Sequence, residues 1–120
     1  MRCSFHPELK KQECIYCKKW RDTFNYFKNR KCSQLAVYCA EFTHYRTDEK
    51  FYKIGLTSRS TDQRFDELRE RFDIKIKWEV KADLYAAVSK ETELLYDTQI
   101  KQRRLYKPKA KFSGQSECFL

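Results

Sequence analysis

The chain has 120 residues, and its 26 lysines and arginines against 17 aspartates and glutamates give a net charge of +9. This length predicts one domain, or a small module joined to a small domain. The 41% of hydrophobic residues suffice for one core. The chain has only two glycines and two prolines, which argues against long disordered segments. No apolar run approaches the roughly 18 residues of a membrane span, and the start lacks an apolar signal segment, so we expect a soluble cytoplasmic protein with no membrane partner.

The positive charge is concentrated at the two ends of the chain. Residues 1–33 hold nine lysines and arginines against three acids, a balance of +6, and residues 101–112 hold six basic residues and no acid. Two basic ends suit a polyanion such as DNA, because neutralising phosphates releases counterions; the alternative is a basic protein whose lysines are only solvated. The candidate DNA-binding residues are Lys18, Lys19, Arg21, Lys28, Arg30, Lys31, Arg103, Arg104, Lys107 and Lys109.

The N-terminal stretch CSFHPELKKQECIYC contains two close pairs of metal-ligand side chains. It reads as Cys-x2-His, seven residues, then Cys-x2-Cys, and two such pairs suit a tetrahedral Zn²⁺. A segment of about thirty residues buries too little surface to fold alone, so a structural metal would supply the missing stability. The spacing is similar to the first half of a B-box zinc module. The predicted zinc ligands are Cys3, His6, Cys14 and Cys17.

The other cysteines leave an alternative open. Either Cys32 or Cys39 can replace one of the four predicted ligands, although Cys39 lies in a hydrophobic run and suits a core position. The even count of six cysteines also permits disulfides, but nothing in the sequence indicates export to an oxidising compartment.

Residues 18–31 mix basic side chains with aromatic rings. Such interleaving suits nucleic acid, with charges for the phosphates and rings for bases or sugars. The alternative is an amphipathic helix that docks the zinc module on the rest of the chain, because Phe24 and Phe27 recur at i,i+3. Both hold if the rings point inward and the charges outward.

Residues 34–57 predict a β-hairpin. QLAVYCAEF (34–42) is apolar and rich in strand formers, a polar connector follows, and FYKIGLT (51–57) is a second strand. We therefore divide the chain into a zinc-binding module with a basic, aromatic linker (1–33) and a main domain (34–120).

A helix, a strand and a second helix are predicted next. Residues 58–72 begin with a capping signal, Ser60 followed by Gln63, and then carry apolar residues at helical spacing: Phe65, Leu68 and Phe72. Residues 73–80 alternate strictly, which predicts a strand with four residues on one face: Ile74, Ile76, Trp78 and Val80. Asp83 is placed to cap a helix over 84–104. The order β-β-α-β-α with a tail describes a small α+β sandwich with an antiparallel sheet.

Three short motifs resemble the GIY-YIG nuclease superfamily, over about residues 34–120. They are a strand ending in Ala36-Val37-Tyr38, a hairpin partner with Lys53-Ile54-Gly55 in a "YKIG-x-T" pattern like that of the phage-type branch, and a C-terminal Gly114-Gln115-Ser116-Glu117-Cys118-Phe119. The chain departs from the family pattern in four places. Ala36 stands where the family has its first glycine, and Lys53 stands where it has the tyrosine of the second element. The connector between these two elements is longer than usual, and the gap from Gly55 to Arg64 has one extra residue. The resemblance implies a DNA endonuclease and suggests a phage origin, hence a host-cell cytoplasm.

The resemblance also implies the site residues. In the family a phenol takes the proton of the attacking water, an arginine holds the phosphate, and a glutamate holds Mg²⁺ or Mn²⁺ near the leaving oxygen; here these are Tyr38, Arg64 and Glu91. An ordinary tyrosine has a pKa of about 10, so we expect Lys53 to be the cation that favours the phenolate. Gly55 is expected to let the backbone turn and a phosphate approach.

Helical register selects Glu91 over Glu93, because Glu91 shares an otherwise apolar face with Ala87 and Leu95. Glu117 is the second candidate ligand, since the terminal motif contains it. A catalytically silent DNA-binding or regulatory protein on the same fold is the alternative function. A homodimer is one way to cut both strands, since a monomer with one site would only nick.

Overall fold

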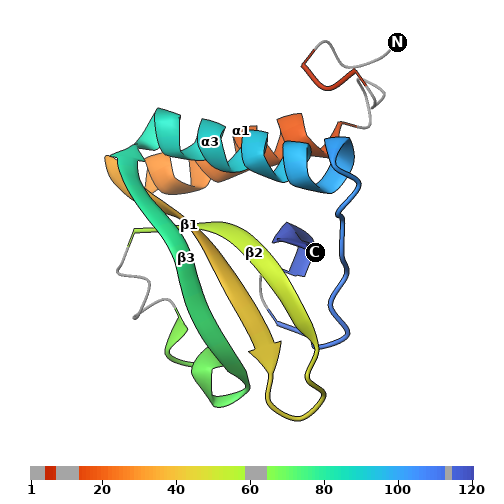
Figure 1. The fold of residues 1–120 in the computed structure, drawn as a ribbon. Coiled ribbons are helices and arrows are strands. Elements are labelled where there is room, and N and C mark those ends of the chain that lie inside the picture. The colour runs from red at the N-terminus through yellow and green to blue at the C-terminus, as the bar shows by residue number, and fades with distance from the viewer. Residues whose placement is uncertain (1–4, 8–13, 59–64, 113–114) are drawn as a thin grey trace.

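The computed structural model describes residues 5–7, 14–58, 65–112 and 115–120 (Figure 1). Its helices and strands are α1 (Ile15–Asn29), β1 (Gln34–His44), β2 (Lys50–Thr57), the 3₁₀ turn η2 (Leu68–Glu70), β3 (Phe72–Asp83), α3 (Leu84–Tyr96), the π-helical turn η3 (Asp97–Lys101), the 3₁₀ turn η4 (Gln115–Glu117) and β4 (Cys118–Phe119). Among these residues we find no helix that is both long enough and apolar enough to span a membrane.

The strands form one antiparallel sheet in the order β3-β1-β2-β4. The hairpin of β1 and β2 pairs Tyr38 with Gly55, and β3 returns along the other side of β1. Strand β4 pairs with β2 only at Tyr52 and Lys53. The predicted α+β class and antiparallel sheet are therefore confirmed. On the edge of β2 that faces away from β1, no described strand pairs with the residues after Lys53.

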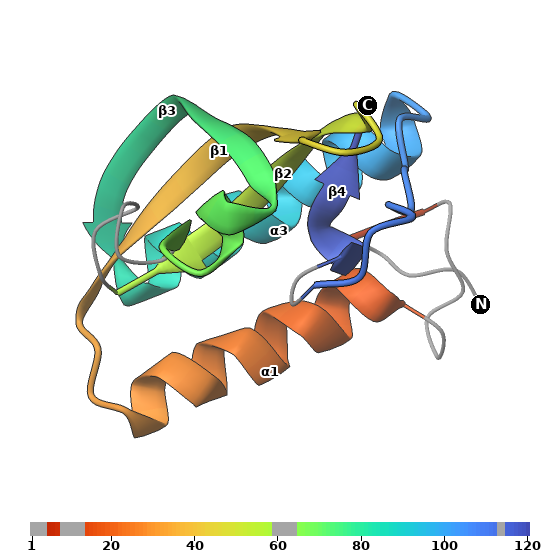
Figure 2. The ribbon, with the colours of Figure 1, turned by 90° about the horizontal axis from the view of Figure 1, so that it is seen from below.

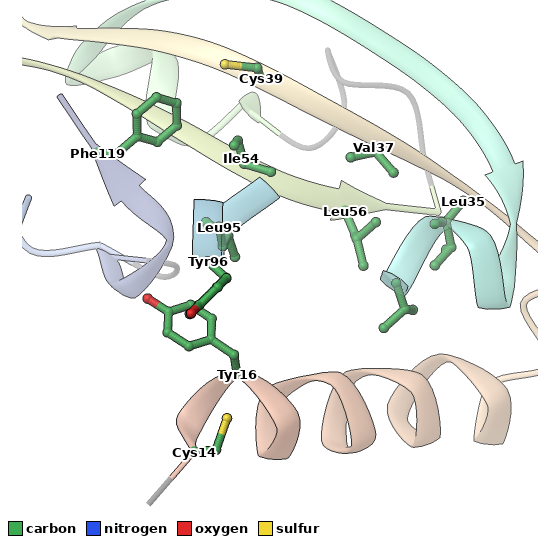
Figure 3. Close-up of a cluster of buried hydrophobic side chains, with 12 residues drawn as sticks. Cys14, Tyr16, Leu35, Val37, Cys39, Ile54, Leu56, Leu95, Tyr96 and Phe119 are labelled. Atoms are coloured by element: carbon green, nitrogen blue, oxygen red, sulfur yellow. The ribbon is translucent and has the colours of Figure 1, made fainter. Parts of the chain in front are cut away.

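Helices α1 and α3 lie on the same side of the sheet (Figures 1 and 2). Helix α3 packs on the sheet and α1 packs against α3. Asp83 caps α3 as predicted, because its carboxylate accepts a hydrogen bond of 2.8 Å from the Ala86 amide. An apolar cluster fills the space between helices and sheet, and Figure 3 shows Leu56 and Leu95 within it.

Helix α1 turns its rings inward, as the docking alternative predicts. Trp20, Phe24 and Phe27 pack against the apolar cluster, whereas the basic residues of the same helix, Lys19 excepted, are exposed. Tyr16 is itself a buried member of that cluster, with Leu35 of β1. Residues 14–29 thus share a core with the main domain, while the boundary at 33/34 stays a prediction.

The opposite face of the sheet carries an aromatic cluster. Its buried members are Tyr38, Ala40, Phe42, Phe51, Phe65, Phe72, Ile74 and Cys118. The C-terminal stretch covers this face through Tyr106 and Phe112. Glu49 anchors that stretch, because its carboxylate accepts hydrogen bonds from the Tyr106 hydroxyl and from the amides of Lys109 and Ala110.

The prediction that residues 73–80 place four apolar side chains on one face is wrong. A bulge interrupts the pairing of β1 with β3, so that Ala40 lies opposite Ile76 but Cys39 lies opposite Trp78. The extra residue, Lys77, reverses which side of the sheet each later side chain faces. Ile74 and Ile76 consequently contact the aromatic cluster, whereas Trp78 and Val80 lie on the helix side and stay 37% and 57% exposed.

The helix predicted over 58–72 is wrong in its C-terminal part. Ser60 and Gln63 lie outside the described residues. Phe65 is helical, but a turn follows it, and the only later helical residues before β3 are those of the 3₁₀ turn Leu68–Glu70. Phe72 already belongs to β3 and pairs with His44. Because the sheet takes up Phe72 in extended form, the chain cannot continue as a helix to that residue.

Candidate functional site

Three of the predicted zinc ligands lie together at the start of α1. The His6 Nδ1 atom lies 3.1 Å from the Cys14 sulfur and 3.2 Å from the Cys17 sulfur, and the three ligand atoms are within 4.8 Å of one another. Cys14 is the N-cap of α1, and its sulfur accepts from the Cys17 amide at 3.4 Å. Two thiols and an imidazole at this spacing can hold a metal ion, and the donor set is compatible with Zn²⁺.

The fourth predicted ligand, Cys3, lies outside the described residues. Of the two alternatives, Cys39 is buried in the apolar cluster, and burial raises the pKa of its thiol. Cys32 lies beyond the far end of α1, about 20 Å along the helix from Cys17 at about 1.5 Å per residue. Figure 3 shows Cys39 on the sheet, across the cluster from Cys14, so neither alternative cysteine is near the His6–Cys14–Cys17 group.

Tyr38 and Lys53 are in direct contact, as the sequence predicts. The Lys53 ammonium donates a hydrogen bond of 2.8 Å to the Tyr38 hydroxyl oxygen, although Lys53 is only 1% exposed. A buried ammonium requires strong partners, and it has a second one in Glu117, 3.7 Å away. The Tyr38 ring stacks on Phe65 with the centroids 5.0 Å apart, which fixes the phenol in place.

Gly55 lies under this contact, which gives it a role the sequence did not reveal. A Cβ atom at Gly55 would lie 2.5 Å from the Tyr38 hydroxyl oxygen and 2.8 Å from the Lys53 nitrogen. The absence of a side chain makes room for the phenol and the ammonium themselves. The expected close approach of a phosphate at this glycine stays a prediction.

Replacing Gly55 with alanine is therefore expected to destabilise the fold by about 1–3 kcal/mol, the usual cost of overpacking a core. The buried Tyr38 ring, held by Phe65, cannot easily move aside. The free energy of unfolding in urea measures this cost. In a Tyr38→Ala background the added cost of Gly55→Ala should be smaller; an equal cost in both backgrounds would contradict the assigned clash.

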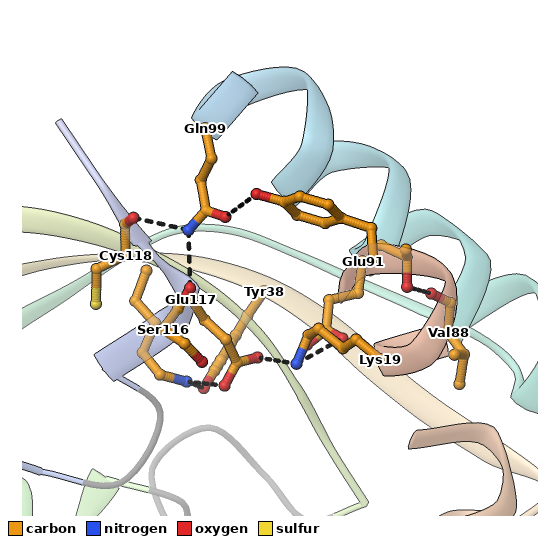
Figure 4. Close-up of polar contacts among 11 residues, drawn as sticks. Lys19, Tyr38, Val88, Glu91, Gln99, Ser116, Glu117 and Cys118 are labelled. Carbon is orange, nitrogen blue, oxygen red and sulfur yellow. Dashed lines mark hydrogen bonds and ion pairs between the residues drawn. The ribbon is translucent and has the colours of Figure 1, made fainter. Parts of the chain in front are cut away.

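Glu91 and Glu117, here called the carboxylate pair, meet beside Lys53. Glu91 projects from α3 and is 1% exposed, and Glu117 comes from the turn η4. Lys19 of α1 bridges them, with its ammonium 3.8 Å from Glu91 and 3.5 Å from Glu117 (Figure 4). One oxygen of Glu91, Oε1, is buried and has no hydrogen-bond partner among the described residues.

The carboxylate pair does not ionise evenly. Burial raises the pKa of Glu91 well above its usual value, and the adjacent Glu117 charge raises it further. Burial also disfavours the charged form of Glu117, but Lys53, together with Lys19 and the hydrogen bond from Glu91, outweighs burial and lowers the pKa of Glu117. Without a metal, Glu117 therefore carries the negative charge and Glu91 retains a proton more readily.

Gln99 holds Glu117 in position. Its side-chain nitrogen donates to the carbonyls of Ser116 and Cys118, each at 2.9 Å, on either side of Glu117 (Figure 4). Its side-chain oxygen accepts from the Tyr16 hydroxyl at 2.7 Å. Gln99 lies in the π-helical turn η3, a distortion that is frequent at functional sites.

Gln99 is not among the residues predicted from the sequence, although the sequence carries a signal for it. The i,i+4 series of buried residues from Ala87 through Glu91 and Leu95 continues to Gln99, so a polar residue occupies a buried stripe for the second time. The sequence predicts Lys19 only as a DNA-binding residue, and nothing in its position along the chain indicates that it reaches the carboxylate pair.

The remaining predicted residues lie apart from this site or outside the described residues. Arg64, the predicted phosphate ligand, lies outside the described residues. Arg104 is half-buried, because its side chain donates to the Leu120 carbonyl and lies over the Phe119 ring. The exposed basic candidates are Lys18, Arg21, Lys28, Arg30, Lys31, Arg103, Lys107 and Lys109.

The site opens to solvent through a shallow depression beside α1. Lys53, Glu91 and Glu117 line its floor with Leu56, and Lys19, Asp22, Thr23, Tyr26 and Phe27 line the side formed by α1. The Tyr38 phenol itself is fully buried. Lys19, whose side chain is 29% exposed, and the exposed Asp22 are the charged groups of α1 at the opening.

No protein-family model, curated protein or solved structure shows significant similarity to this chain.

Proposed function

We propose that this chain is a metal-dependent DNA endonuclease of the GIY-YIG type that hydrolyses phosphodiester bonds. One observation carries the proposal: a buried ammonium, Lys53, joins the Tyr38 phenol to the Glu91–Glu117 carboxylate pair at the floor of one depression. The phenol comes from β1, the ammonium from β2, and the two carboxylates from α3 and the C-terminal turn η4. The fold therefore brings together side chains that are far apart in the sequence. Perturbed ionisable groups gathered in a cleft are typical of functional sites.

The groups present suit hydrolysis of a phosphodiester. In the proposed step Tyr38 first releases its hydroxyl proton to solvent, and the Lys53 ammonium stabilises the negative charge left on the oxygen, which then takes a proton from the attacking water. The water oxygen bonds to phosphorus, one P–O ester bond breaks, and the leaving oxygen takes a proton from solvent. Glu91 and Glu117 would hold Mg²⁺ or Mn²⁺, which supplies positive charge for the leaving oxygen.

The rest of the chain would bind the substrate. The exposed lysines and arginines of α1 and of the C-terminal stretch suit DNA phosphates, and Arg64 is the proposed phosphate ligand near the reaction. We propose a structural Zn²⁺ at the His6–Cys14–Cys17 group, with Cys3 as the fourth ligand. The zinc module would then fix the first turn of α1 and aid DNA binding.

Nicking of supercoiled plasmid by the zinc-loaded protein, with Mg²⁺ or Mn²⁺, tests the proposal. We expect wild-type protein to nick the plasmid and both Glu91→Gln and Tyr38→Phe to fall to the protein-free background. Glu93→Gln and Tyr45→Phe are matched controls, since both residues are exposed, and should nick like wild type. Wild-type protein that cleaves with neither metal, or variants that cleave as well as wild type, would contradict the proposal.

Full burial of Tyr38 favours a second candidate, a DNA-binding protein without activity on the same fold. A phenol that water does not reach cannot act as a base unless the structure opens. A mobility-shift assay on the same plasmid separates the two candidates: a retarded band without cleavage in either metal supports the binding protein, and Lys53 would then have a structural role.

A further inference from the structure

We propose that Lys19 is a tethered cation that occupies the divalent-cation site between Glu91 and Glu117, so that a metal ion binds when Lys19 withdraws. The proposed regulatory meaning rests on the proposed nuclease function. The cation site itself rests on geometry alone and can be tested without DNA.

The carboxylate pair is a cation site that Lys19 fills incompletely. The ammonium lies 3.8 Å from Glu91 Oε1, beyond hydrogen-bond distance, and that oxygen is buried with no hydrogen-bond partner among the described residues. A carboxylate oxygen binds Mg²⁺ at about 2.0–2.1 Å. A smaller and more highly charged ion therefore fits this oxygen better than the ammonium does.

The other lysine of the site is fixed, which distinguishes the two cations. Lys53 is buried to 1% exposure and is bonded to Tyr38 at 2.8 Å. Lys19, in contrast, lies on the rim of the depression with a 29% exposed side chain. Its four-carbon stem is flexible, so withdrawal needs no change in α1.

Lys19 also has another partner within reach once it withdraws. Asp22 lines the same depression and lies three residues further along α1, a spacing at which side chains of opposite charge pair on a helix surface. A DNA phosphate at the opening would offer a second partner. Either partner would draw Lys19 away from the carboxylate pair, so substrate binding would favour metal binding at the same site.

Mn²⁺ titration of the full zinc-loaded chain, followed by the loss of the free Mn²⁺ signal in electron paramagnetic resonance, tests the inference. Lys19→Met removes the ammonium but keeps the stem, and we expect the Mn²⁺ dissociation constant to fall about tenfold, which corresponds to about 1.4 kcal/mol. Lys90→Met is the matched control, because it removes one charge from an exposed position beside Glu91 in sequence, and it should bind like wild type.

Two further variants locate the Mn²⁺. In the Lys19→Met background, Glu91→Gln and Glu117→Gln should each remove the gain in affinity. Lys19→Gln is the second test of the charge, and thermal melting verifies that each variant is folded. The inference is overturned if folded Lys19→Met and Lys19→Gln bind Mn²⁺ no tighter than wild type or Lys90→Met. It is also overturned if the gain in affinity persists when Glu91 or Glu117 is replaced.

The nicking assay on the same proteins separates this inference from the proposed function. Tighter Mn²⁺ binding by the Lys19 variants without any nicking would support the cation site and reject the nuclease. Nicking by wild type, with unchanged Mn²⁺ binding by the Lys19 variants, would reject the tethered cation and leave the nuclease in place.

Discussion

Lys53→Met is expected to lower the rate of plasmid nicking by about 10²–10⁴-fold, the range typical of a lost general base. The ammonium is the cation in hydrogen-bond contact with the Tyr38 hydroxyl oxygen, at 2.8 Å. Without it, nothing in the described contacts of Tyr38 stabilises negative charge on that oxygen. Initial nicking rates at saturating Mg²⁺ measure the effect, and DNA retardation should change little because Lys53 is buried.

Two controls separate chemistry from charge and from folding. Lys75→Met removes one positive charge from an exposed position on β3 and should nick at the wild-type rate. Lys53→Arg keeps a cation near Tyr38 and should retain more activity than Lys53→Met, with both variants compared at temperatures below their measured melting points. Nicking by folded Lys53→Met at the wild-type rate would exclude Lys53 from the mechanism.

The parts of the fold that the sequence predicts are those governed by local patterns. The hairpin of 34–57 follows from two apolar, β-branched runs, and β1 and β2 lie within about two residues of the predicted ends. The start of α3 follows from a single residue, because Asp83 both ends β3 and caps the helix. These features need no knowledge of distant contacts.

The errors arise where a distant contact overrides the local pattern. Strict alternation in 73–80 assumes an unbroken ladder, but the bulge at Lys77 depends on how β1 pairs with β3. Helical spacing in 58–72 is outweighed because Phe72 pairs with His44 in the sheet. A single sequence cannot reveal either pairing, since both partners lie tens of residues away.

The candidate site shows the same division. The contact between Tyr38 and Lys53 is predictable, because hairpin register places residues 38 and 55 opposite each other and Lys53 on the same face. The position of Glu117 beside Lys53 is not predictable, because Gln99 and Tyr16 determine it through hydrogen bonds between three separate segments. The role of Lys19 is hidden for the same reason.

These hydrogen bonds also connect the proposed zinc group to the carboxylate pair. Tyr16 lies between Cys14 and Cys17 in the sequence, and its hydroxyl donates to Gln99. Gln99 in turn holds the backbone on both sides of Glu117. A metal at the start of α1 would therefore stabilise more than the N-terminal segment, since it would fix the turn of α1 from which Tyr16 reaches the site.

Removal of zinc is accordingly expected to lower the melting temperature by about 10 °C or more. Structural zinc in small modules contributes about 10–16 kcal/mol of apparent binding free energy, and in a domain of this size each 1 kcal/mol corresponds to roughly 2–8 °C. Only a part of that energy is expected to be lost, because the aromatic cluster on the face of the sheet away from the helices contains no residue of α1. Thermal melting with and without a zinc-selective chelator, in the absence of Mg²⁺, measures the loss.

Cysteine variants decide whether the zinc group is the cause. Cys14→Ser and Cys17→Ser should reproduce the effect of the chelator and be insensitive to it, whereas Cys32→Ser, at the other end of α1, should melt like wild type. If the Tyr16–Gln99 connection carries the effect to the site, Tyr16→Phe should retain zinc but bind Mn²⁺ more weakly in the Lys19→Met background. A melting temperature that is unchanged by the chelator and by Cys14→Ser would show instead that packing of α1 on α3 holds Tyr16, and thereby Glu117, in place without a metal.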